Sequence, residues 1–194
     1  MPLTKDDYIF FWKTDEVHGW GSQWIHSPFT VPINLDPSNP NSTAEPITFP
    51  TAEHWMMFQK ALLFNDVAVA REVLSITKIN SPAMAEVKAL GRKVQNFDEA
   101  KWVAHRDRIV LEGNLHKFRQ NEEMMKKLLD TGNKRLVEAS PRDRIWGVGY
   151  GEKNALSQKD SWGLNLLGKA LEETRRILRE ELESQAQAHE ADNE

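Results

Sequence analysis

One predicted helix carries two ionisable side chains within an otherwise apolar run. The stretch FPTAEHWMMFQKALLF, residues 49–64, lacks the alternation of a strand and predicts a helix that is buried on most sides. Glu53 and Lys60 fall on one face of that helix, about two turns apart, so they could form the floor and the wall of a pocket. Alternatively, this face lies at the surface and both groups are solvated, because Trp55 and Phe58 on the other faces could supply the core contacts.

Further side chains with useful chemistry lie later in the chain. Trp102 falls in a long predicted helix, where its indole could either pack in the core or contact a ligand. Arg92 lies at the end of another predicted helix, where a cation complements the helix dipole or contacts a phosphate. Asp143 and Trp146 belong to the glycine-rich sequence SPRDRIWGVGYG, whose backbone amides could approach a ligand closely.

The chain lacks the residues that several kinds of site require. The chain has no cysteine, which removes disulfides, thiolate zinc sites and thiol nucleophiles. His54 and His105 belong to no H-E-x-x-H motif and to no carboxylate–histidine cluster at ligand spacing, so we expect no metal site. The glycine-rich loop matches neither a Walker loop nor G-x-G-x-x-G, so a nucleotide fold of those kinds is unsupported.

The composition is that of a globular protein outside the membrane. The 194 residues suffice for one domain, with 40% hydrophobic and 28% charged residues. A run of about 18 apolar residues, as a membrane-spanning helix requires, is missing, and the N-terminus makes a poor signal peptide. The net charge of −4 argues against coating nucleic acid through bulk charge but leaves room for a local basic groove. We therefore expect an intracellular, cytoplasmic protein.

The elements that would position these side chains are mainly helical. Short strands are predicted at 8–12, 24–31, 47–49 and 135–139 from aromatic and β-branched residues, and a proline-rich loop at 34–46. Caps, prolines and apolar periodicity predict helices from Thr51, from Asp66 to about Ile76, from Ser81 to Gly91, from Glu99 to about Phe118, from Asn121 to about Thr131 and from about Leu164.

These elements predict one domain over residues 1–183, followed by a flexible, solvated tail over 184–194. The fold class is mainly α, or α+β: a single multihelical domain with a small antiparallel β element near its N-terminus.

Six motifs occur in order along the chain. They are S-Q-W-x-x-S-P-F-T-V (22–31), F-P-T-A-E-H-W (49–55) with Gln59 and Lys60, A-L-G-R (89–92), Trp102 with G-N-L-H-K-F (113–118), L-V-E-A-S-P-x-D-R-I-W-G (136–147) and G-L-N-L-L-G (163–168). Together they resemble the NADAR, or YbiA-like, N-glycosidase family over about residues 8–180. The resemblance implies a mainly helical fold, hydrolysis of the bond between a ribose and a nitrogen base, and no cofactor.

The resemblance also assigns roles to particular residues. It places the key acid at Glu53, a second acid at Asp143 and the active-site tryptophan at Trp102. Further residues in matching motifs are expected to bind substrate, namely Lys60, Arg92, Trp146 and Asn165. Many members carry Ser-Asn-Phe where this chain has Ser22-Gln23-Trp24, and residues 152–162 lengthen a loop, so Ser22 and Trp24 are candidates for substrate selection.

Two substrates are compatible with the family. One branch acts on phosphoribosylamino-pyrimidine intermediates of riboflavin synthesis, and another removes ADP-ribose from guanine in DNA or RNA. The aromatic N-terminal segment and the lengthened loop favour the larger, ADP-ribosylated ligand. Glu53 would stabilise an oxocarbenium-like sugar, and Lys60 and Arg92 would contact phosphates. The alternatives are a reader that binds such ligands without cleaving them and a helical interaction protein with an adhesive tryptophan surface.

Overall fold

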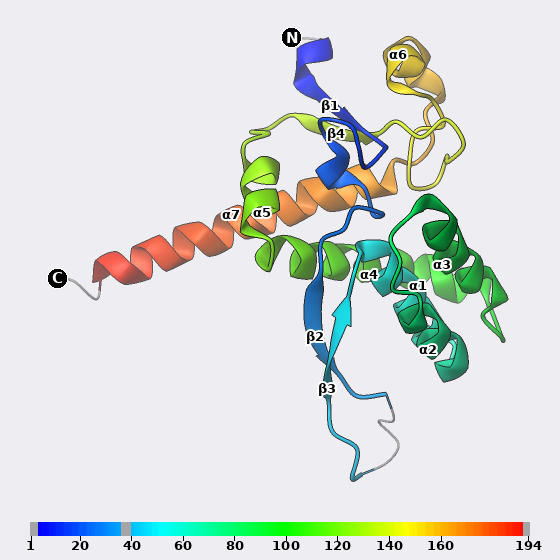
Figure 1. Ribbon diagram of the computed structural model, residues 1–194. Helices are drawn as coiled ribbons and strands as arrows, with labels where there is room; N and C mark the ends of the chain where they lie inside the picture. The colour runs from blue at the N-terminus through cyan, green and yellow to red at the C-terminus, as the bar shows by residue number, and fades with distance from the viewer. Residues whose placement is uncertain (1–3, 36–39, 192–194) are drawn as a thin grey trace. The chain divides into compact units, whose positions relative to one another are not determined.

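The computed structural model describes residues 4–35 and 40–191, which form two compact units (Figure 1). One unit is Gln23–Asn121, and the other combines the two ends of the chain, up to Ser22 and from Glu122. Helices predominate in the described residues, and short strands accompany them. The predicted mainly helical α+β fold is therefore confirmed.

The antiparallel β element lies in the unit Gln23–Asn121. Strand β2 (Phe29–Ile33) pairs with β3 (Glu45–Phe49), and Phe29 lies opposite Phe49. Both rings are buried and stack with their centroids 5.6 Å apart. The expected antiparallel pairing is confirmed, but the strand predicted over 24–31 was wrong over its first part, since β2 begins at Phe29.

Four helices complete this unit. Helix α1 packs against each of the other three (Figure 1). Most of its own buried residues lie toward its N-terminus. The helices are α1 (Ala52–Leu63), α2 (Val67–Ser75), α3 (Ser81–Lys93) and α4 (Glu99–Arg119).

Three of these helices begin at the capping residues that the sequence predicts. In each, a side-chain oxygen accepts the backbone N–H three residues later, which satisfies a donor that the first turn leaves open. The pairs are Thr51 with His54, Asp66 with Val69 and Asp98 with Lys101. For α3 the cap is Asn80 rather than the predicted Ser81, and the helix passes through Gly91 to Lys93 instead of ending at that glycine.

Two glycines mark the places where helices approach α1 most closely. The indole N–H of Trp55 donates to the carbonyl of Ile109 at 2.8 Å, and a Cβ on Gly113 would overlap the same indole. At Gly91 a Cβ would overlap the sulfur of Met57. Gly91 therefore lies inside α3 because the helix needs a small residue against α1, and not because it ends the helix.

The second unit is built on a parallel strand pair. Strand β1 (Tyr8–Phe11) lies beside β4 (Arg135–Glu138), with Tyr8 opposite Arg135. The sequence predicted both strands but not their pairing. Helix α7 (Leu166–Ala191) packs on β4, and α5 (Glu122–Leu129) packs on α7. The short helices of this unit are Lys5–Asp7, Gly19–Gly21, α6 (Glu152–Ala155) and Leu156–Ser161.

Helix α7 runs farther than the sequence indicates. The segment predicted as a tail from residue 184 is helical up to Ala191 and is exposed to solvent, and residues 192–194 lie outside the described part of the chain. Flexibility of this end stays a prediction. Among the described helices, α7 included, none is both long and apolar enough to cross a membrane.

Replacing Gly113 by alanine tests the close approach of α1 and α4. The added methyl group would overlap the Trp55 ring, which its hydrogen bond holds in place. Overpacking costs about 1–3 kcal/mol and outweighs the helix propensity that alanine gains. We expect Gly113→Ala to lower the free energy of unfolding in urea by at least about 1 kcal/mol.

The matched control for this substitution is Gly151→Ala. A Cβ at Gly151 meets nothing within 4 Å, and its φ of −66° suits alanine. This variant should unfold within about 0.5 kcal/mol of the wild type. Equal stability of the two variants would show that the gap at Gly113 is not needed.

Candidate active site

Glu53 lies in the first turn of α1, where the helix dipole favours a carboxylate. Its side chain is only 5% exposed, and Met56 and Met57 on the same face are buried as well. The backbone N–H of Glu53 donates to the carbonyl of Gln23 at 3.0 Å, which ties the start of the helix to the segment before β2. The interpretation that both ionisable groups of this face are solvated is therefore wrong for Glu53, which is buried together with its two methionine neighbours.

His54, the next residue, has a structural role. Its ring is fully buried, with Nε2 2.9 Å from the carbonyl of Ile76 and Nδ1 2.8 Å from the hydroxyl of Thr51. A carbonyl can only accept, so Nε2 carries the proton and Nδ1 accepts from the hydroxyl. Burial lowers the pKa of His54 and keeps the ring neutral. Within residues 4–35 and 40–191, no three His, Cys, Asp or Glu side chains lie together as a metal-binding group.

Lys60 extends from α1 between two aromatic rings. Its Nζ lies 4.3 Å from the ring centroid of Phe97 and 5.2 Å from that of Trp102. Trp102 occupies the first turns of α4, and Phe97 directly precedes the Asp98 cap of that helix. An ammonium group over aromatic faces is attracted by their negative quadrupoles, so the two rings hold Lys60 at the junction of α1 and α4.

Two further charges act on Lys60. Burial lowers its pKa, the positive charge of Arg92 lowers it further, and the negative charge of Glu99 raises it. Arg92 lies on the last turn of α3 and is exposed. The structure thus brings Lys60 and Trp102, two of the residues predicted from the motifs, into contact, and Arg92 is near enough for its charge to act on Lys60.

Phe97 was not predicted from the sequence. An apolar residue directly before a helix cap is a local signal, because it often packs against the fourth residue of the helix, here Trp102. That signal predicts packing but says nothing about Lys60, which approaches from another helix. Phe97 is also the ring of this cluster with open surface: it is 43% exposed, whereas Trp102 is 7% exposed.

Asp143 lies in the other unit, at the start of a fixed turn. One of its carboxylate oxygens, Oδ1, accepts the backbone N–H groups of Ile145 at 2.9 Å and Trp146 at 2.8 Å. A Cβ on Gly147 would lie 2.7 Å from the carbonyl oxygen of Glu138, so only glycine fits where this turn meets β4. Asp143 and Trp146 are both half-buried. Their motif therefore has a structural basis, and their contacts with substrate stay predictions.

Asn165 supports the same strand. Its Oδ1 accepts the backbone N–H of Glu138 at 3.0 Å, and its Nδ2 donates to the carbonyl of Leu136 at 2.9 Å. The residue is buried and has a φ of +51°, a conformation that asparagine tolerates better than most residues. The amide therefore acts as a brace for β4. Binding of substrate by Asn165 stays a prediction.

The two candidates for substrate selection, Ser22 and Trp24, fall in different units. Ser22 is buried, and its backbone N–H donates to the carbonyl of Gly19 at 3.0 Å. Trp24 is half-buried. Their part in selecting the substrate stays a prediction.

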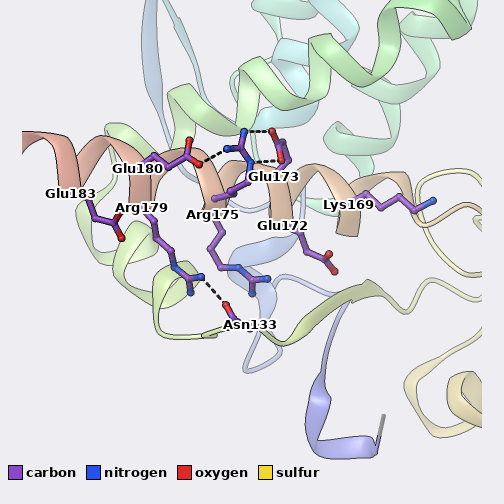
Figure 2. A pocket seen from close by; sticks show the side chains of 9 residues that line it. Asn133, Lys169, Glu172, Glu173, Arg175, Arg179, Glu180 and Glu183 are labelled. Atoms are coloured by element: carbon purple, nitrogen blue, oxygen red, sulfur yellow. Dashed lines mark hydrogen bonds and ion pairs between the residues drawn. The ribbon is translucent and has the colours of Figure 1, made fainter. Parts of the chain in front are cut away.

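A charged surface pocket lies along α7, and none of the predicted site residues lines it (Figure 2). Arg175 donates to the hydroxyl of Thr131 at 2.7 Å and to the carbonyl of Lys134 at 2.9 Å. Figure 2 shows Arg179 directed at Asn133, whose side-chain oxygen accepts at 3.0 Å. These arginines hold the turn that leads into β4, so the pocket is explained by the fold.

Comparison with known proteins fits this geometry. The family model for the NADAR domain matches residues 10–179. The chain belongs to the NADAR family. An N-glycosidase of Acanthamoeba polyphaga mimivirus is 40% identical over 175 residues, which are 87% of this chain and 95% of that protein. A riboflavin biosynthesis protein of Vibrio vulnificus is 29% identical over 178 residues, covering 92% of this chain and 39% of that protein.

A solved structure shows the same fold. The NMR structure of the Escherichia coli protein YbiA superposes with a TM-score of 0.67 at 24% identity, covering 92% of this chain and 89% of that one. The prediction of a YbiA-like multihelical domain is confirmed. This NADAR protein is an N-glycosidase, as its relatives of that name indicate. It is thus a hydrolase of glycosidic bonds to nitrogen.

The buried state of His54 predicts how stability depends on pH. Burial lowers its pKa below the ordinary 6.5, so under acidic conditions the unfolded chain binds more protons than the folded protein. The contribution of His54 to stability is therefore fully present above its unfolded pKa of 6.5 and is lost as the pH drops below that value. Urea unfolding at a series of pH values should show this fall, and His116, whose pKa burial also lowers, adds to it.

Histidine variants separate the contributions to this fall. His54→Gln should be less stable at neutral pH but should lose less stability on acidification. His26 is exposed, and His26→Gln should keep the steeper dependence of the wild type. An equal slope in the wild type and in His54→Gln would contradict the assignment.

Proposed function

We propose that this NADAR protein removes ADP-ribose from ADP-ribosylated guanine in nucleic acid by hydrolysing the N-glycosidic bond. One observation carries the proposal: the buried carboxylate of Glu53 shares a helix face with Lys60, which lies between two aromatic rings and beside the charge of Arg92. This arrangement offers an anion for a developing sugar cation and a cation for phosphate groups on one helix, and Arg92 adds a second cation from α3.

The carboxylate fits the chemistry of the bond. Breaking the bond between C1 of ribose and a base nitrogen builds positive charge on the sugar ring, and a nearby carboxylate stabilises that charge. Glu53 also takes a proton from the attacking water as the oxygen of that water bonds to C1. The bond between C1 and the base breaks, and the departing base gains a proton at its nitrogen. The products are free ADP-ribose and unmodified guanine.

The spacing along α1 fits a substrate with phosphates. Residues 53 and 60 are separated by roughly 10 Å along the helix axis at 1.5 Å per residue. This span exceeds one ribose ring, so a cation at Lys60 would meet groups beyond the sugar. Lys60 and Arg92 are therefore assigned to the phosphates of the substrate.

The remaining roles rest on the family motifs. Asp143 is assigned to position the sugar or to assist proton transfer to the departing base. Trp102 holds the ammonium of Lys60 toward the substrate, because its ring is mostly buried beneath that group. The further substrate contacts are assigned to Trp146, Asn165, Ser22 and Trp24.

A second candidate substrate is a phosphoribosylamino-pyrimidine intermediate of riboflavin synthesis. The relative from Vibrio vulnificus, named a riboflavin biosynthesis protein, favours it. Such a substrate has one phosphate and one base, so it would use Glu53 in the same way but would engage fewer cations. A reader without catalytic activity is disfavoured by the N-glycosidase relatives.

Glu53→Gln tests the catalytic carboxylate. The amide keeps the shape of the side chain and removes the charge, so we expect kcat to fall by about 100-fold or more. Release of free ADP-ribose from an oligonucleotide with one ADP-ribosylated guanine measures this rate. Glu86→Gln, at an exposed position of α3, is the control and should keep the wild-type rate. Full activity of Glu53→Gln would overturn the role of this residue.

Turnover of the two substrates side by side tests the specificity. We expect kcat/KM for the ADP-ribosylated oligonucleotide to exceed that for the phosphoribosylamino-pyrimidine by about tenfold or more. The reason is that additional phosphate contacts lower the free energy of the transition state. The reverse order would assign the protein to riboflavin intermediates. Binding of either substrate without any release of product would favour the reader.

A further inference from the structure

Phe97 is an exposed aromatic residue at a position where packing requires only an apolar side chain. Phe97 stands directly before the Asp98 cap of α4 and packs on Phe64, with ring centroids 5.2 Å apart. An apolar residue at this position fixes the start of a helix by contact with the first turns, and leucine would serve as well. Yet the chain has a phenylalanine that remains 43% exposed.

The surroundings of this ring suit a nucleotide. Lys60 lies 4.3 Å from its centroid, and Arg92 is close enough for its charge to act on Lys60. Proteins that bind nucleotides combine an aromatic surface, on which a base stacks, with cations that follow the phosphates. Phe97 supplies the first of these features, and Lys60 and Arg92 supply the second.

We propose that Phe97 is the stacking surface for a nucleobase that is joined to the scissile ribose through phosphate groups, such as the adenine of ADP-ribose. This inference rests on the proposed function and names a residue that selects the substrate. A second base at Phe97 would favour ADP-ribosyl substrates over phosphoribosyl ones, which carry no base beyond their phosphate.

The rise along α1 from Glu53 to Lys60 favours the base at the far end of the ligand. The base that departs in the reaction is bonded directly to C1 of the ribose, so it lies next to Glu53. Lys60 is roughly 10 Å farther along α1, and Phe97 lies over Lys60. A ring at that distance stacks on a base at the other end of the ligand, beyond the phosphates.

Two substitutions at Phe97 separate stacking from packing. Phe97→Leu keeps an apolar contact with Phe64 but removes the aromatic face, and Phe97→Tyr keeps that face. Val103→Ala is the control, because Val103 is also 43% exposed and follows Trp102 in the same helix. Melting temperatures of the three variants report whether the start of α4 is intact.

Calorimetric binding of ADP-ribose and of ribose 5-phosphate is the main measurement, and KM and kcat for the ADP-ribosylated oligonucleotide are the second. We expect Phe97→Leu to weaken ADP-ribose binding and to raise KM by about tenfold, as loss of one stacked base predicts. Binding of ribose 5-phosphate and kcat should change little. Phe97→Tyr should recover most of the affinity, and Val103→Ala should behave as the wild type.

Other outcomes would overturn the inference. Wild-type affinity of Phe97→Leu for ADP-ribose would reduce Phe97 to a packing residue. An equal loss of affinity for ribose 5-phosphate would indicate general damage to the site, and a raised KM with unchanged ADP-ribose binding would place a base of the nucleic acid on the ring. If the wild type releases no ADP-ribose, the proposed function fails, but the binding measurements still decide the role of Phe97.

Discussion

The contact between Trp55 and α4 is the constraint on which the candidate site depends. The indole donates to the carbonyl of Ile109 and fills the space that Gly113 leaves open, so helices α1 and α4 are fixed against each other at one point. Lys60 lies less than two turns beyond Trp55, and it reaches Trp102 only because that point is fixed. Unlike most core contacts, this one is directional, and it sets the rotation of α1 as well as its distance from α4.

Helix α1 carries three ionisable side chains in a largely buried environment, and each avoids the cost of desolvation differently. His54 stays neutral and satisfies both ring nitrogens within the protein. Lys60 keeps its charge at the edge of the core, against aromatic faces. Glu53 lies in the first turn, where the helix dipole favours an anion. Only the last two have charges that can serve a ligand.

Sequence reasoning succeeded where an interaction spans a few residues and failed where it spans many. The caps at Thr51, Asp66 and Asp98 were predictable because each is completed within three residues. The roles that the ordered motifs assign to Glu53 and Lys60 stay predictions. The place of Phe97 beside Lys60 was not predictable, because it follows from how α1 packs on α4 and leaves no trace in either segment. Gly91 was misjudged for the same reason: its partner, Met57, belongs to another helix.

The parallel pairing of β1 with β4 has a consequence for how the chain folds during synthesis. β1 leaves the ribosome first, but its partner follows only after the whole of Gln23–Asn121 has been made. The middle unit can therefore fold while the first strand, with its apolar residues Tyr8, Phe10 and Phe11, still lacks the strand that will cover it. Contacts between segments that lie so far apart in the sequence form slowly, so the apolar residues of β1 wait longest for the strand that covers them in this unit.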